Sequence, residues 1–290
     1  MGVKIFELVP KTEIELSALA GKRVAIDTSL FLYQFLATIR GSDGSLLTDS
    51  KGRVTSHLIG LFSRTTKLMQ AGIKPCFVFD GKPPVLKKAE QQRRAELKLD
   101  AEAKYHVAVK EEARDAMRKY AARSIHLTKE MVGEARKLIE ALGLPCVQGA
   151  SEGEAQAAYL AKQGAVWASA SQDADSLIFG ASRLVRNLAV TGRRKKPGQL
   201  AYTFVRPELI ELKDVLHTLQ LTQDQLIALA MLVGTDYNIG GIKGIGPKKA
   251  VKLVTEHGKN FSALFAAVKW SDSFETAWEE IFDLFKNPSV

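Results

Sequence analysis

The chain has 290 residues, 46% hydrophobic and 25% charged, which is enough apolar material for the core of a sizeable folded domain. Its formal net charge of +9 favours polyanionic partners, nucleic acid above all. No apolar run approaches the length of a membrane helix and the amino terminus lacks the apolar core of a secretory signal, so we expect no membrane partner and an intracellular location.

Four segments in the first two thirds of the chain read as a strand followed by a helix. They are residues 22–40, 72–84, 143–164 and 165–180. Near-continuous apolar strands that alternate with helices are typical of a mainly parallel sheet covered on both faces. We therefore predict an α/β fold, with a ligand site beyond the carboxyl ends of the strands.

Two other regions are predicted to be helical. Residues 85–125 are dense in Lys, Arg, Glu and Ala and nearly free of Gly, Pro and large apolar residues. This composition favours helix but offers little apolar face to bury, so we expect one or two exposed helices that project from the core. The segment 222–268 returns to helices with apolar spacing.

In every predicted strand–helix unit, acidic residues stand where the strand ends and the helix begins, and one more acid follows an apolar helix. They are Asp27, Asp80, Glu152, Glu154, Asp173, Asp175 and Asp236. Seven carboxylates in one crevice would repel each other unless they were protonated or bound cations. Ligand sets made only of oxygen suit Mg²⁺ and Mn²⁺, and two such ions can clamp a phosphodiester and activate water. The recurrence favours a two-metal site.

Ordinary helix capping is the alternative interpretation of some of these acids. Ser151 and Glu154 have the spacing of a capping box, and Asp173 is a plausible N-cap residue. A cap needs only one acid at each helix end, however, so Glu152 and Asp175 are harder to explain in this way.

A glycine-rich stretch, "GGIKGIGPKKAVKLV", covers residues 240–254. Pro247 stands where the first helical residue is expected, which predicts a helix–hairpin–helix. Gly244 and Gly246 would expose backbone N–H groups, and Lys248 and Lys249 would add positive charge, so the stretch is predicted to bind a DNA phosphate. The alternative is a plain interhelical turn with a C-capping glycine.

The acids and the hairpin together give the chain a marked resemblance to the structure-specific 5′ nucleases, and to their flap endonuclease branch in its compact archaeal form. The matching stretches include "VAIDTSLFLYQFL", "FVFDGKPP", "SEGEAQAAYLAKQG", "SQDADSLIFG", "LVGTDYN" and "GIKGIGPKKA". The resemblance implies a 5′-nuclease or PIN-like fold with a helical arch. It also divides one compact nuclease domain into residues 1–98, an arch linker 99–115, residues 116–258 and C-terminal helices 259–290.

Metal and catalytic roles follow from the same resemblance. Asp27, Asp80 and Glu152 match ligands of one Mg²⁺ ion, and Mn²⁺ is expected to substitute. Asp173, Asp175 and Asp236 match ligands of a second ion, and Glu154 acts near it or through water. Lys87 and Arg94 match basic catalytic residues, and their spacing of seven places both on one helix face. Without the resemblance they would read as solvated helix surface.

Further DNA contacts are implied as well. Tyr33 matches an aromatic residue that stacks on a base, although core packing is an equal alternative from the sequence. Gly2 matches a position where removal of the initiator Met leaves an amino terminus near the active site. Arg40 begins a loop, residues 40–57, that corresponds to a region meeting bent duplex DNA.

The predicted function is a flap endonuclease that also has 5′–3′ exonuclease activity and serves DNA replication and repair in a prokaryote-type cell. Its expected partners are branched DNA with a 5′ flap and, from the resemblance, a sliding clamp (PCNA), although no clamp-binding motif is visible near the end of this sequence. We expect a monomer. The alternatives are a related 5′ exonuclease or junction-cleaving nuclease, an inactive junction-binding protein, and a PIN-type ribonuclease.

Overall fold

The computed structural model describes residues 2–41, 43–195 and 202–290. Within them, a seven-stranded sheet has the order β1-β9-β6-β5-β2-β3-β4. The strands from β6 to β4 are parallel, and β9 pairs antiparallel with β6 on one side and with the edge strand β1 on the other. The strands are β1 (Thr12–Glu13), β2 (Arg23–Asp27), β3 (Lys74–Phe79), β4 (Cys146–Gln148), β5 (Ala168–Ala170), β6 (Arg183–Arg186) and β9 (Glu208–Glu211). The predicted mainly parallel sheet is confirmed.

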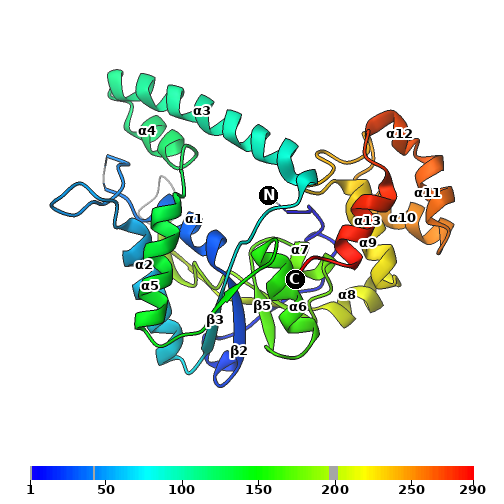
Figure 1. Cartoon of the computed structure of the whole chain (residues 1–290), viewed down its shortest axis with the longest axis horizontal. Coiled ribbons are helices and arrows are strands. Elements are labelled where there is room, and N and C mark those ends of the chain that lie inside the picture. Colours follow the sequence, from blue (N-terminus) through cyan, green and yellow to red (C-terminus); the bar gives the residue numbers. More distant parts are fainter. Residues whose placement is uncertain (1, 42, 196–201) are drawn as a thin grey trace.

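Helices cover both faces of this sheet (Figure 1). Side chains alternate along β2, so that Ala25 packs into one core while Val24 and Ile26 pack into the other. The core around Ile26 is closed by α1 (Thr28–Thr38), α2 (Ser56–Gln70) and α5 (Lys129–Ala141). The core around Ala25 is closed by α6 (Gly153–Lys162), α7 (Asp175–Ile178) and the carboxyl-terminal helices.

The charged segment 85–125 forms an exposed helical arch, as predicted. A short 3₁₀ turn (Val85–Lys87) leads into α3 (Lys88–Lys110), and Glu112 turns the chain back with φ 52° into α4 (Arg114–Ala121). Figure 1 shows α3 extending away from the body of the molecule with α4 beside its far end. Ala101 and Ala108 are buried although most of α3 is exposed, because small side chains permit the close approach of a second helix.

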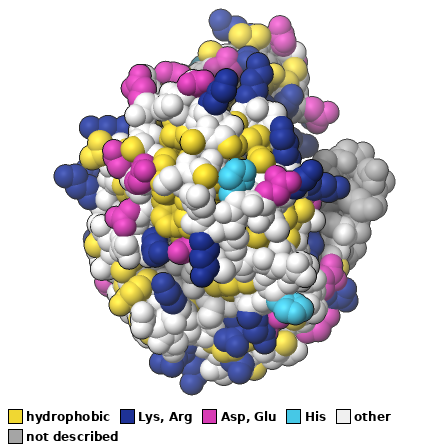
Figure 2. Space-filling model, turned by 90° about the vertical axis from the view of Figure 1, so that its right-hand side faces the viewer, with side chains coloured by type: hydrophobic (Ala, Val, Ile, Leu, Met, Phe, Trp, Pro, Cys, Tyr) yellow, Lys and Arg dark blue, Asp and Glu magenta, His cyan; other side chains and the backbone are white. Residues whose placement is uncertain are grey.

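The carboxyl-terminal third is mostly helical, as predicted. It contains α8 (Leu212–Leu219), α9 (Gln223–Val233), α10 (Pro247–His257), α11 (Phe261–Ala267), α12 (Trp270–Ser273) and α13 (Trp278–Lys286). A separate hairpin pairs β7 (Gly192–Lys195) with β8 (Tyr202–Val205), and a 3₁₀ helix spans Leu16–Leu19. Figure 2 shows Lys and Arg side chains spread between hydrophobic and acidic ones on the side that carries α10 to α12. Among the described residues, no helix is long and apolar enough to cross a membrane.

Candidate active site

One cleft of about 680 Å³ lies at the carboxyl ends of the parallel strands. Its walls include all seven predicted acids, together with both predicted catalytic cations: Asp27, Asp80, Glu152, Glu154, Asp173, Asp175, Asp236, Lys87 and Arg94. Residues from separate parts of the sequence meet here because parallel strands end at the same edge of a sheet.

The strand order places Asp27 and Asp80 side by side. Asp27 is the last residue of β2, and Asp80 directly follows β3, the parallel neighbour of β2. The Asp27 carboxylate also accepts a hydrogen bond from the Leu30 backbone N–H at 3.1 Å, so it caps α1. Asp80 is held by the Ser29 hydroxyl and by the backbone N–H of Gly153 at 2.7 Å. Both carboxylates are therefore fixed by the starts of helices.

The capping interpretation of the other acids is wrong. Helix α6 has Glu152 as its N-cap residue without a side-chain capping bond, so Ser151 and Glu154 form no capping box. The N-cap residue of α7 is Ala174, which leaves Asp173 outside the helix. Glu154 instead accepts hydrogen bonds from the backbone N–H and hydroxyl of Ser176, at 3.0 and 2.8 Å. These acids face the cleft and do not serve their own helix ends.

Burial and mutual repulsion disfavour the ionised forms of three of these acids. Desolvation, reinforced by Asp80, raises the pKa of Asp27 from 3.8 to about 7. Desolvation also raises the pKa of Asp175 to about 7, against the opposing hydrogen bond from the Val3 N–H. The pKa of Glu154 is raised well above 4.5 by desolvation and by Asp175. Such a crowded set of oxygen ligands fits a hard divalent cation, whose charge would remove the repulsion.

Two cations of the chain itself already lie among the acids. Lys87 pairs with Glu152 and, at 3.2 Å, with Asp236. Arg94 donates through Nη2 to both carboxylate oxygens of Asp236, at 2.8 Å each. Among the described residues, no three acidic, His or Cys side chains converge on one point as they would around a bound metal ion. Glu152 and Asp236 form ion pairs with Lys87 and Arg94 in this arrangement.

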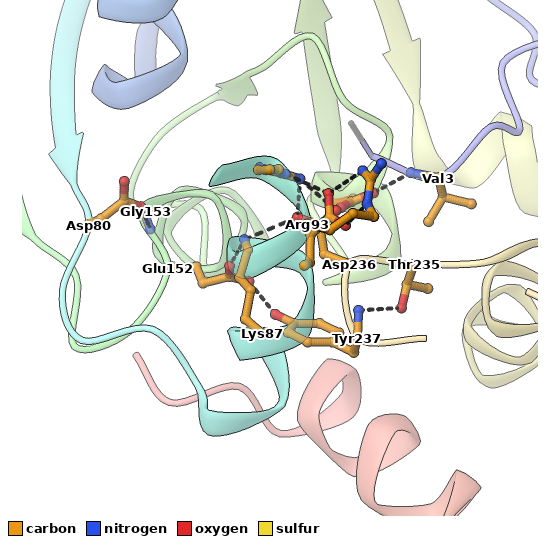
Figure 3. A network of polar contacts seen from close by, with 12 residues as sticks. Val3, Asp80, Lys87, Arg93, Glu152, Gly153, Thr235, Asp236 and Tyr237 are labelled. Atoms are coloured by element: carbon orange, nitrogen blue, oxygen red, sulfur yellow. Dashed lines mark hydrogen bonds and ion pairs between the residues drawn. The ribbon is translucent and has the colours of Figure 1, made fainter. Parts of the chain in front are cut away.

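Two further residues of the site carried no signal in the sequence. Tyr237 donates a hydrogen bond from its hydroxyl to Glu152, and Figure 3 shows Tyr237 and Lys87 both pointing toward that carboxylate. Desolvation and the nearby Asp175 raise the pKa of Tyr237, so it stays a donor. Glu90, on the first turn of α3, accepts hydrogen bonds from Arg93 and Arg94.

The amino terminus reaches the cleft as expected. A Cβ atom added to Gly2 would lie 2.5 Å from Cβ of Asp173 and 2.6 Å from Oδ1 of Asp175, so the position leaves no room for a side chain. Tyr33 lines the cleft and its side chain is 37% exposed, with the Lys98 ammonium 5.0 Å from the ring centroid. Core packing is therefore the wrong interpretation of Tyr33.

The remaining predicted DNA contacts lie away from the cleft. Arg40 donates Nε to the Leu36 carbonyl and Nη1 to the Gly44 carbonyl, at 2.8 and 2.7 Å, so it secures the end of α1 and the following loop. Partial burial lowers its pKa. Arg40 thus has a structural role in linking the end of α1 to the loop that follows it. Its role in DNA binding stays a prediction.

The glycine-rich hairpin joins α9 to α10. Pro247 is the first residue of α10, as predicted, and Gly244 adopts a positive φ of 81° that favours glycine. Gly244 and Gly246 have open space where a side chain would stand, and Lys248 and Lys249 are exposed. The backbone and lysines of the hairpin are thus accessible to a ligand from outside the protein.

Comparison with known proteins supports the family suggested by the sequence motifs. Residues 1–101 match the model of the XPG N-terminal domain and residues 143–236 match the XPG I-region. Over 290 residues the chain is 53% identical to Flap endonuclease 1 of Pyrococcus furiosus, covering 100% of this chain and 84% of that protein. The chain belongs to the flap endonuclease family.

Solved structures agree with this flap endonuclease assignment and confirm the predicted fold. The flap endonuclease-1 structure from Methanococcus jannaschii has a TM-score of 0.75 and 42% identity, over 100% of this chain and 85% of that one. The catalytic core of Rad2, solved in complex with DNA, has a TM-score of 0.69 and 26% identity, over 100% and 87%. The predicted division of the chain near residues 98, 115 and 258 stays a prediction.

Proposed function

We propose that this protein is a structure-specific 5′ nuclease that hydrolyses a phosphodiester of branched DNA near the junction of a 5′ flap with duplex, and that it also trims 5′ ends. The observation that carries this proposal is one cleft that is lined by seven carboxyl side chains and by Lys87 and Arg94. The similarity of the chain to flap endonucleases supports this proposal. We propose that the protein acts inside the cell, in DNA replication and repair.

The acidic cleft is proposed to hold two Mg²⁺ ions, with Mn²⁺ as a substitute. Asp27, Asp80 and Glu152 would hold one ion, and the aspartates at 173, 175 and 236 the other, with Glu154 near it. When bound, the ions would activate water and offset negative charge on the phosphate. The protein's own contribution is to hold the acids in place, through contacts such as Gly153 N–H to Asp80 and Val3 N–H to Asp175.

Lys87, in the 3₁₀ turn that precedes α3, and Arg94, in α3, are proposed to act on the scissile phosphate. Both line the cleft, where they pair with Glu152 and Asp236. Each could exchange its carboxylate partner for a phosphate oxygen and stabilise negative charge that develops in the transition state. Tyr33, exposed at the cleft beside Lys98, is placed to stack on a nucleotide base.

Contacts outside the cleft are proposed to grip the DNA backbone. Gly244, Gly246, Lys248 and Lys249 would hold a phosphate of the duplex without reading its sequence. The arch of α3 and α4 is the proposed guide for the single-stranded 5′ end. A sliding clamp is proposed as a protein partner and the working form as a monomer.

Cleavage of a fluorescent 5′-flap duplex tests this function. The wild-type protein should cut near the junction with Mg²⁺ but leave the flap intact with EDTA, and Asp175→Ala should be inactive with Mg²⁺. A nicked four-way junction in parallel reactions separates flap cleavage from junction cleavage. Cleavage that survives EDTA would refute the metal mechanism, and equal cleavage of unbranched duplex would refute the structure specificity.

A further inference from the structure

Glu90 is a buried carboxylate on a helix that is otherwise mostly exposed. It lies in the first turn of α3 and is 2% exposed, whereas its neighbours Ala89 and Gln91 are exposed. A buried charge is costly unless it is paired and hydrogen-bonded. Its position on an exposed arch helix therefore indicates a specific requirement for this carboxylate.

Two arginines satisfy Glu90 completely. Arg93 donates Nε and Nη2 to its two oxygens at 2.7 and 2.8 Å, and Arg94 donates Nε to Oε1 at 2.6 Å. Burial alone would raise the pKa of Glu90, but the hydrogen bonds from Arg93 and Arg94 lower it to about 2. Glu90 is thus ionised whenever the protein is at neutral pH, and it faces both guanidinium groups as an acceptor.

The Arg94 guanidinium donates hydrogen bonds from two of its nitrogen atoms to two different carboxylates. The Nε edge is bound to Glu90 within the same helix, four residues earlier. The Nη2 atom reaches Asp236, which belongs to another part of the fold. The first contact is internal to α3 and therefore does not depend on the position of Asp236.

We propose that Glu90 is a positioning residue that holds the Arg94 side chain with its Nη2 edge facing the cleft, ready to bind the phosphate that is cut. This inference rests on the proposed nuclease function. An arginine side chain that is 38% exposed would otherwise sample many rotamers, and fixing it would cost conformational entropy. The contact with Glu90 fixes the side chain before DNA arrives, so that this cost does not fall on the reaction step.

Glu90→Gln tests this role, because it keeps the shape of the side chain but replaces one acceptor oxygen by an N–H₂ group that opposes the arginine donors. Glu96→Gln is the matched control: Glu96 lies on the same helix, is exposed, and accepts a hydrogen bond from Gln92 at 3.4 Å. We expect Glu90→Gln to slow single-turnover cleavage of a 5′ flap by about 10-fold. Its dissociation constant for the same DNA in Ca²⁺, and the rate of Glu96→Gln, should stay unchanged.

A double variant separates positioning from a general structural role. In the Arg94→Ala background, Glu90→Gln should slow cleavage no further, because the side chain that Glu90 orients is gone. If Glu90→Gln costs the same factor in both backgrounds, Glu90 does not act through Arg94 and the inference is wrong. A loss of DNA affinity equal to the loss of rate would also contradict it.

A readout without catalysis keeps this inference distinguishable from the proposed function. The ¹⁵N–¹H resonance of Arg94 Nε, assigned from its absence in Arg94→Ala, should be protected from solvent exchange in the wild type and should shift and lose protection in Glu90→Gln. An unchanged resonance would refute the positioning role even in an active enzyme. A wild-type protein that leaves flaps uncut would instead refute the nuclease function, while this resonance would still decide the role of Glu90.

Discussion

Lys87 bridges Glu152 and Asp236, two carboxylates of the acidic cleft that lie 84 positions apart in the sequence. The ammonium group occupies a place between proposed ligands of the two different ions. It therefore both compensates the acids when no metal is bound and stands next to the proposed position of the scissile phosphate.

This double role predicts opposite effects of Lys87→Ala on metal binding and on cleavage. Removal of a cation from beside Glu152 and Asp236 should tighten Mn²⁺ binding a few-fold, measured by electron paramagnetic resonance without DNA. The same change should slow single-turnover flap cleavage by about 100-fold, because a charge that stabilises the transition state is lost. Lys88→Ala, one residue further on and exposed, should change neither value. Weaker Mn²⁺ binding by Lys87→Ala would contradict the idea that the Lys87 ammonium competes with metal ions for Glu152 and Asp236.

Asp175→Asn is expected to stabilise the metal-free protein while abolishing cleavage. Burial raises the pKa of Asp175 from 3.8 to about 7 in the folded protein. The folded state therefore binds more protons than the unfolded state between about pH 4 and pH 7, and stability falls as the pH rises through this window. An asparagine can still accept the hydrogen bond from Val3 but carries no charge to bury.

Thermal unfolding in EDTA at several pH values checks this expectation. The variant should gain on the order of 2 kcal/mol over the wild type at pH 8. The gain should shrink as the pH falls through this window and should vanish below about pH 3, where the wild-type carboxyl is protonated in both states. If the variant is less stable than the wild type at pH 8, burial of the ionised Asp175 carboxylate does not destabilise the folded protein.

Gly2→Ala should damage the active site through a single methyl group. The new Cβ would stand 2.5 Å from Cβ of Asp173 and 2.6 Å from Oδ1 of Asp175, so the amino terminus or the two acids must move. We expect cleavage to fall by about 10-fold or more, with DNA affinity in Ca²⁺ unchanged. Gly133→Ala is the control, since it lies in α5 with no atom within 4 Å of the added Cβ. Wild-type activity of Gly2→Ala would argue against a tight fit at this point.

The hairpin lysines should affect binding and leave the chemistry intact. The double change Lys248→Ala and Lys249→Ala should weaken affinity for flap DNA and reduce the slope of log affinity against log salt by about 2. The cleavage rate at saturating enzyme should stay within about 2-fold, because neither lysine is among the described residues that line the acidic cleft. Lys252→Ala, exposed on the same helix, controls for net charge. If the slope of log affinity against log salt is unchanged in the double variant, the two lysines of the hairpin do not contact DNA phosphates.

The sequence predicted the parts of this site that follow from strand order. Asp27 and Asp173 could be placed at one edge because each follows an apolar strand, and parallel strands align their ends. The arch could be predicted because residues 85–125 combine helix-forming composition with too few apolar residues to be buried. Both predictions rest on local patterns in the sequence. For the acids, the geometry of the parallel sheet then brings the strand ends together.

Contacts that depend on tertiary packing could not be predicted. Glu90 is one of many acids in a charged helix, and only the folded structure shows that it is buried between Arg93 and Arg94. Tyr237 follows directly after a predicted ligand, yet its partner Glu152 lies 85 residues away. The sequence spacing of these residues does not predict the contacts of Glu90 with the arginines or of Tyr237 with Glu152. Each contact depends on how α3 and the segment after α9 pack against the ends of the strands.

Helix α3 begins directly after Lys87, contains Arg94 in its first part and packs against α4 at its other end. Its 23 residues span about 35 Å as a single α-helix. A strand that tilted this helix on entering the proposed arch would also move both cations, because one precedes its first residue and the other lies within it. The proposed capture of a free 5′ end and the position of the two proposed catalytic cations would then be coupled through one helix.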